Sequence, residues 1–210
     1  MKKTKIICIN EFNIIKFIKN NKLLLLLLFL FVLGVILSVV LYRKDFLSNK
    51  FSIWIFNCYF STKINSFLIS LGKCFVSLLL IVVLFFICGT SMMGIITVPI
   101  LISALGFTIG SLVSRVYSVY GIKGVAYTAV ILIPSALIFL SSLFVTSRHT
   151  INFSFSLAKL TFSNSFSKNI SQEFKGYCFK YISLFVFTFL SAFLDVILNN
   201  SFLKYFEFSL

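Results

Sequence analysis

The sequence predicts an all-α fold, a polytopic membrane helix bundle with about five transmembrane helices plus interfacial amphipathic helices. Of the 210 residues, 60% are hydrophobic and only 11% are charged. A soluble domain normally has about a quarter of its residues charged, so composition excludes a soluble globular chain. The apolar residues also gather into runs that approach or exceed the ~18 residues needed to cross a bilayer. We therefore expect a single membrane-embedded domain over residues 23–210, preceded by a short basic segment.

That basic segment is expected over residues 1–22. It contains six lysines and one acid, Glu11, and its apolar residues recur at roughly helical spacing. This pattern predicts an amphipathic helix lying on anionic lipid headgroups, with a disordered basic tail as the alternative. Nucleic acid is not an expected partner despite the net charge of +14. The basic residues flank apolar runs and form no patch interleaved with aromatic residues.

Five apolar stretches predict the membrane spans. They cover about residues 23–42, 67–88, 95–113, 125–145 and 181–198. The first stretch is too long for a signal-peptide core of about 7 to 15 residues, and it ends in Tyr42-Arg-Lys. We therefore expect it to remain as an uncleaved span.

The connections between the spans are unequal. In the first, Phe51–Phe60 is apolar and contains Trp54, which predicts either an interfacial segment or a lip packed over the bundle. A short polar loop is expected at residues 115–124. Residues 146–180 form the longest polar region. An amphipathic helix is predicted there from apolar residues at steps of three and four: Ile151, Phe155, Ala158, Phe162 and Phe166.

Five spans would place the two termini on opposite sides of the cell membrane. The amino-terminal side would then carry eleven Lys and Arg residues and the other side eight. Because cytoplasmic loops carry an excess of Lys and Arg, this bias predicts a cytoplasmic amino terminus and an outside carboxy terminus.

The stretch from Gly89 to Val145 holds both prolines and most of the glycines. Gly106-Phe-Thr-Ile-Gly110 is a G-x-x-x-G, whose small residues let two helix backbones approach closely in lipid. Pro134 should kink its helix, and we favour a packing role for it over a substrate-lining role. The residues predicted to pack helices or to contact a partner are Gly89, Gly94, Pro99, Gly106, Gly110, Gly121, Gly124 and Pro134.

The titratable side chains predict no enzyme, metal site or cofactor site. His149 is the single histidine, and the five cysteines form no C-x-x-C pair. Asp195 is the one acid inside a predicted span, near the end that it shares with Arg115 and Lys123. We predict a structural ion pair between Asp195 and one of these cations. The alternative is that Asp195 reaches the interface alone.

The order of motifs in the central stretch resembles the stage II sporulation protein M family of endospore-forming bacteria. A span ends in Gly89-Thr-Ser-Met-Met-Gly94, and Pro99, the G-x-x-x-G, Tyr120-Gly-Ile-Lys-Gly124 and Pro134 follow. The resemblance is at motif level from Gly89 to about Ile138 and architectural elsewhere. It implies a non-enzymatic membrane scaffold that anchors peptidoglycan hydrolases during septal engulfment. Ser135-Ala-Leu-Ile follows Pro134 where the family carries an amide side chain, which leaves open a divergent paralogue with another partner.

A membrane subunit of an ABC-type transporter or permease is the alternative function. The two proline-containing spans would then form its moving or substrate-lining element. Few charges lie within the predicted spans, which counts against ion-coupled transport but not against an ATP-driven membrane component.

Overall fold

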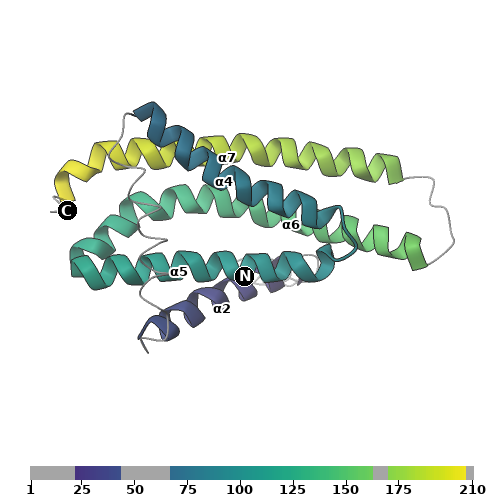
Figure 1. Cartoon of the computed structure of the whole chain (residues 1–210), viewed down its shortest axis with the longest axis horizontal. Coiled ribbons are helices and arrows are strands. Elements are labelled where there is room, and N and C mark those ends of the chain that lie inside the picture. The colour runs from purple at the N-terminus through teal and green to yellow at the C-terminus, as the bar shows by residue number, and fades with distance from the viewer. Residues whose placement is uncertain (1–21, 44–66, 163–169, 207–210) are drawn as a thin grey trace, which may run out of the picture.

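The computed structural model describes residues 22–43, 67–162 and 170–206, and in these ranges the chain is a bundle of helices (Figure 1). They are α2 (Lys22–Arg43), α4 (Phe67–Gly89), α5 (Gly94–Tyr127), the π-helix η2 (Thr128–Leu132), α6 (Ile133–Phe162) and α7 (Ile170–Phe206). Within the described ranges, residues 90–93, the turn between α4 and α5, lie outside the helices, and Gly121 within α5 has non-helical backbone angles. The predicted all-α class is confirmed for this part of the chain.

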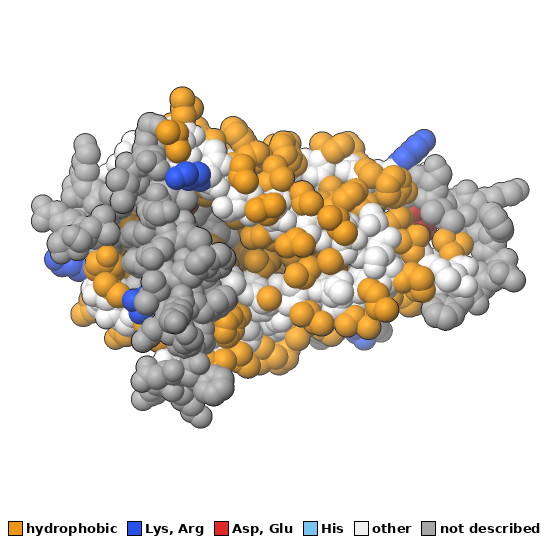
Figure 2. Space-filling model, in the orientation of Figure 1, with side chains coloured by type: hydrophobic (Ala, Val, Ile, Leu, Met, Phe, Trp, Pro, Cys, Tyr) orange, Lys and Arg blue, Asp and Glu red, His pale blue; other side chains and the backbone are white. Residues whose placement is uncertain are grey.

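The helices have the length and composition of membrane spans. Four stretches are long and apolar enough to cross a membrane: Lys22–Tyr42, Phe67–Gly89, Gly94–Thr161 and Gln172–Ser201. Leu26 and Leu37 of α2 are more than half exposed, as expected of side chains that face lipid. Figure 2 shows apolar side chains across the middle of the visible face, with Lys and Arg toward its two ends. Because a helix satisfies its own backbone hydrogen bonds, it can cross hydrocarbon. The chain is a multi-pass membrane protein.

The stretch Gly94–Thr161 has 68 residues and would extend about 100 Å as one straight helix. Instead the chain reverses at Gly121, whose φ of 58° and ψ of −133° are not helical. Glycine adopts a positive φ readily because it has no Cβ. Figure 1 shows α5 turning at this point and α6 running back beside it. Ile102 of α5 and Phe139 of α6 share one core, so α5 and α6 form an antiparallel hairpin.

This reversal differs in form from the polar loop predicted at residues 115–124. Helical backbone continues on both sides of Gly121, and α5 extends to Tyr127. Gly124 lies within the bend, where an added Cβ would be only 2.5 Å from the Val116 carbonyl oxygen. One glycine in a non-helical conformation therefore makes the turn that a loop was expected to make.

The polar region predicted at residues 146–180 is largely a continuation of α6 and α7. The predicted apolar stripe does not face one way, because Ile151 is buried whereas Phe155 is about half exposed. Packing against α7 determines which side of this part of α6 is buried. The spacing of the apolar residues alone did not predict that side. The interfacial segments predicted within residues 1–21 and 44–66 lie outside the described residues.

Glycines allow a close approach between α2 and α5. A Cβ on Gly106 would overlap the carbonyl oxygen of Phe31, and a Cβ on Gly34 would overlap that of Ser103. A Cβ on Gly110 would lie 3.0 Å from a backbone carbonyl oxygen of α2. In lipid, such close contact supplies the dispersion energy that drives helix association. The G-x-x-x-G face, expected to be either an internal or a partner surface, is covered by α2.

Gly106→Ala should destabilise the bundle, because the added methyl group overlaps the Phe31 carbonyl. Overpacking of this kind costs about 1–3 kcal/mol. Gly72→Ala is the matched control, since no atom lies within 4 Å of a Cβ at that position. Alanine also favours helix over glycine by about 1 kcal/mol. Thermal unfolding of the detergent-solubilised chain should place Gly106→Ala below the wild type and Gly72→Ala at or above it. Equal midpoints for the two variants would contradict the close α2–α5 contact.

Candidate functional site

Buried polar side chains concentrate between α6 and α7. Thirteen polar or charged side chains are buried among the described residues, and ten of them belong to η2, α6 or α7. We call these ten the polar seam: Thr128, Ser135, Thr146, Ser147, Thr150, Ser154, Thr188, Ser191, Asp195 and Asn199. A polar side chain inside a membrane is costly unless it is bonded, so such residues mark structural or functional sites. The polar seam is therefore the candidate functional site.

The α7 part of the seam lies on one helix face. Thr188, Ser191, Asp195 and Asn199 follow one another at steps of three, four and four residues. Residues at these spacings are neighbours on a helix surface. This stripe was not predicted, because the fifth span was identified by its apolar content and only Asp195 stood out. Its signal, the helical spacing of polar residues, is nevertheless present in the sequence.

At one end of the seam, Asp195 lies between α4 and α6. Its Oδ1 is 3.2 Å from the hydroxyl oxygen of Ser135, and its Oδ2 is 3.7 Å from the sulfur of Cys74. One turn earlier in α7, the Ser191 hydroxyl donates to the Ser135 carbonyl oxygen at 2.8 Å. We call these residues the Asp195 cluster: Cys74, Ser135, Ser191 and Asp195. They connect α4, α6 and α7.

The backbone beside the Asp195 cluster is the π-helix η2, which is followed by Pro134. Proline has no N–H to donate, so it removes one hydrogen bond from the preceding turn. The predicted kink at Pro134 takes the form of this widened turn, a feature that often occurs at functional sites. Tyr127, which precedes η2, donates from its hydroxyl to Asn199 Oδ1 at 3.2 Å. Both ends of η2 are thus bonded to the polar face of α7.

The predicted cationic partners of Asp195 lie on α5. Arg115 is partly buried, and its Nε atom makes no hydrogen bond among the described residues. Lys123 is exposed beside the bend at Gly121. The described contacts of the Asp195 carboxyl group include those with Ser135 and Cys74. An ion pair with Arg115 or Lys123 stays a prediction.

At the other end of the seam, hydroxyl groups bond the last carbonyls of α4. The Tyr177 hydroxyl donates to the Phe86 carbonyl oxygen at 2.9 Å, and the Ser154 hydroxyl donates to that of Gly89 at 2.9 Å. The last four carbonyls of a helix have no partner within the helix and need one from elsewhere. Thr90 and Ser91 of the α4–α5 turn bond the carbonyls of Phe86, Ile87 and Cys88. Ser154 of α6 bonds that of Gly89, and Tyr177 of α7 adds a second bond to Phe86.

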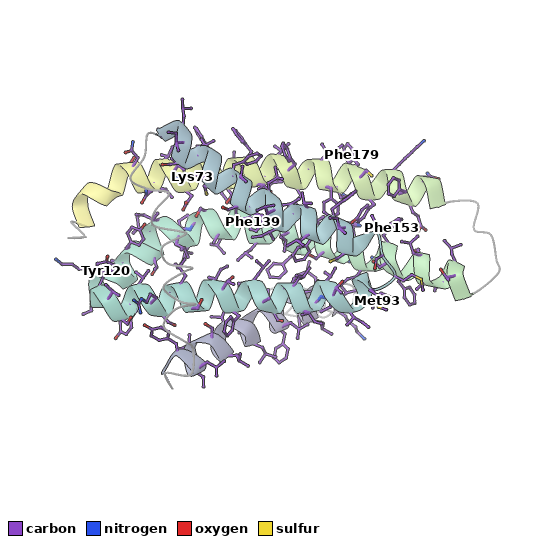
Figure 3. The ribbon with its side chains drawn as sticks, viewed as in Figure 1. Lys73, Met93, Tyr120, Phe139, Phe153 and Phe179 are labelled. Atoms are coloured by element: carbon purple, nitrogen blue, oxygen red, sulfur yellow. The ribbon has the colours of Figure 1, made fainter. Side chains whose placement is uncertain are left out.

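Aromatic rings pack around these hydrogen bonds. Tyr177 stacks on Phe153 with ring centroids 4.8 Å apart and on Phe86 at 5.3 Å. The Tyr181 hydroxyl lies 2.9 Å from the hydroxyl of Thr150. Figure 3 shows Phe153 toward the same end of the bundle as Met93 of the α4–α5 turn. We call the hydroxyl-bearing residues of this end the tyrosine cluster: Thr150, Ser154, Tyr177 and Tyr181.

The two glycines that flank the α4–α5 turn lie against the tyrosine cluster. A Cβ on Gly89 would overlap Thr150 and Tyr177, and a Cβ on Gly94 would overlap Ser154. Both glycines thus make close internal contacts. Pro99, which was predicted to act with them, lies in the second turn of α5. A role of these residues in contacting a partner protein stays a prediction.

An apolar layer separates the two clusters. Phe139, Leu143 and Leu184 are buried between them. Thr188, beside this layer, donates to the Leu184 carbonyl of its own helix at 2.8 Å. The seam therefore contains two clusters that are hydrogen-bonded between helices and are separated by apolar side chains. Among the described residues, no group of three or more His, Cys, Asp or Glu could hold a metal ion. Chemically, the arrangement can join helices through hydrogen bonds to side chains and backbone.

Comparison of the chain with protein-family models, with curated proteins and with solved structures found no match.

Tyr177→Phe should destabilise the bundle by about 1 kcal/mol, because it removes the hydrogen bond from α7 to the Phe86 carbonyl, which then keeps only the bond from the Thr90 N–H of the α4–α5 turn. The ring and its stacking are retained, so the loss reports the hydrogen bond. Tyr117→Phe is the matched control, since Tyr117 is 58% exposed on α5. The measurement is the thermal midpoint in detergent, which should fall for Tyr177→Phe and stay within error for Tyr117→Phe. An unchanged midpoint for Tyr177→Phe would show that the tyrosine cluster does not hold the α4–α5 turn.

Proposed function

We propose that this chain is a non-enzymatic scaffold subunit of the cell membrane, which holds partner proteins in place and does not itself transform a substrate. The observation that carries the proposal is the way the polar seam is bonded. Tyr177 and Ser154 donate to the backbone of α4, and Ser191 donates to the backbone of α6. Nine of the ten seam side chains have a hydrogen bond, Ser147 being the exception among them, and bonded polar networks make a core rigid. A bundle joined in this way near both ends is better suited to a fixed platform than to a moving pathway.

We further propose that the chain crosses the membrane five times. The reversal at Gly121 supports this number, because it divides Gly94–Thr161 into two antiparallel parts. Each part is longer than the ~20 residues that a spanning helix needs. With α2, α4 and α7, this gives five crossings. The eleven-to-eight excess of Lys and Arg supports a cytoplasmic amino terminus and an outside carboxy terminus.

The proposed partner is a peptidoglycan hydrolase acting during septal engulfment. Support for this partner comes from the resemblance of the stretch from Gly89 to about Ile138 to the stage II sporulation protein M family. On this proposal the bundle anchors the hydrolase at the membrane, and the chemistry belongs to the hydrolase. A divergent paralogue would keep the same platform for a different partner.

A membrane subunit of an ABC-type transporter is the second candidate, and the Asp195 cluster favours it. This cluster places a carboxyl group, 7% exposed, beside a π-helix and a proline. Ionisable groups inside a membrane and broken or widened helices are features from which transporters build substrate sites. On this candidate, Asp195 acts on a solute and does not only join helices.

One purification separates the two candidates. The tagged full chain is isolated from its native membranes, and the eluate is assayed for degradation of isolated peptidoglycan sacculi and for ATP hydrolysis. The scaffold proposal predicts degradation of sacculi above the level of an untagged control. Asp195→Asn should preserve this activity, because asparagine keeps the side-chain size and an acceptor for the Ser135 hydroxyl. An eluate that hydrolyses ATP but leaves sacculi intact would reject the scaffold in favour of the transporter.

A further inference from the structure

The helix α2 gives the depth of the hydrocarbon core. Its 22 residues rise about 33 Å, close to the ~30 Å of a typical bilayer core. Gly34 of α2 packs against Ser103 of α5, and Tyr42 lies farther along, 2.7 Å from Ser118 through their hydroxyl oxygens. The two helices therefore run parallel. Phe31 packs against Gly106 and Val35 against Gly110, so each residue of α2 lies level with the α5 residue numbered 75 higher. Lys22 is therefore level with Thr97, and the α4–α5 turn, which ends four residues earlier, lies about 6 Å farther out, at the membrane boundary.

The helices α6 and α7 continue beyond this boundary. Ser154 and Tyr177 lie level with it, because they bond the last carbonyls of α4. The end of α6, at Phe162, is eight residues past Ser154, and the start of α7, at Ile170, is seven residues before Tyr177. These extensions are about 12 and 10 Å long. They pass through the headgroup layer, which is about 7 Å thick on each side of the core. Figure 1 shows both helices extending past the α4–α5 turn.

Exposed phenylalanines and lysines alternate on these extensions and the adjoining turn of α7. We call them the basic rim: Phe155, Lys159, Phe174, Lys175, Phe179 and Lys180. The ammonium group of Lys159 lies 4.7 Å from the centroid of the Phe155 ring. Glu173 is the one acid among the described residues of this part. The basic rim is therefore both positively charged and apolar.

We propose that the basic rim binds the phosphate groups of anionic phospholipids. The positive charge of the three lysines favours an anionic ligand. Each lysine near an anionic membrane surface strengthens binding to that surface about fivefold. The phenylalanines favour a lipid over a soluble anion, because placing their rings at the boundary between headgroups and acyl chains lowers the free energy of binding. Lys180 lies about one turn on the core side of Tyr177, and its long side chain reaches outward to the phosphates. This surface would give the bundle a preferred lipid environment at one face of the membrane, independently of the scaffold role.

The test uses the full chain in nanodiscs that contain equal parts of phosphatidylglycerol and phosphatidylcholine. Native mass spectrometry gives the ratio of the two lipids that remain bound when the protein is released. The wild type should retain phosphatidylglycerol preferentially, and Lys159→Gln/Lys175→Gln/Lys180→Gln should lower the ratio by at least fivefold. The matched control is Lys73→Gln/Lys123→Gln, which removes charges from exposed lysines at the opposite end and should keep the wild-type ratio.

Two further measurements keep the proposal open to rejection. The triple Lys→Arg variant at the same positions retains the charge, so it should retain the lipid preference and show that loss in the Gln variant is not misfolding. An excess of inorganic phosphate should leave the ratio unchanged. An unchanged ratio in the Gln variant, an equal loss in the control, or displacement by inorganic phosphate would each overturn the proposal.

Discussion

Gly121 holds a backbone conformation that a residue with a side chain rarely adopts, and at that point α5 turns back into η2 and α6. Everything packed on the second half of the hairpin depends on this turn. It brings Phe139 of α6 into the core that contains Ile102 of α5, and it directs Ser135 and Ser154 toward α7 and α4. Without the turn, the α5–α6 stretch would be three times longer than a bilayer core is thick.

Two kinds of contact hold the helices together, and they occur at different interfaces. Between α2 and α5, glycines such as Gly106 let the backbones touch. Between α6, α7 and α4, hydroxyl and carboxyl groups bond across the helices, as Tyr177 does to Phe86. Both kinds suit a membrane, where the hydrophobic effect does not drive helices together. Polar contacts of this kind restrict helix movement, which favours the proposed platform over a gated pathway.

The long apolar helices were predictable from the sequence, because a long apolar run in a bilayer satisfies its backbone hydrogen bonds as a helix. The form of the connections between these helices could not be predicted in the same way. Polar residues at 115–124 predicted a loop, and those at 146–180 predicted a polar region with a separate amphipathic helix. A helix can leave the hydrocarbon and continue, so polarity does not mark the end of a helix. The G-x-x-x-G at Gly106 was recognised from its spacing. The helix that packs on this face, α2, could be identified only from the tertiary structure. The polar stripe around Asp195 was readable as a helical repeat, whereas the partners that it bonds on α6 and α4 required the fold.

Because the chain reverses at Gly121, we propose that it crosses the membrane twice between Gly94 and Thr161. Single cysteines placed at Thr90, Lys123 and Thr161 in a cysteine-free chain, all exposed positions, can be labelled with a membrane-impermeant maleimide in intact cells. The account predicts that Lys123→Cys reacts from outside and that Thr90→Cys and Thr161→Cys react only after the membrane is permeabilised. Labelling that places Thr90 and Thr161 on opposite sides would contradict it.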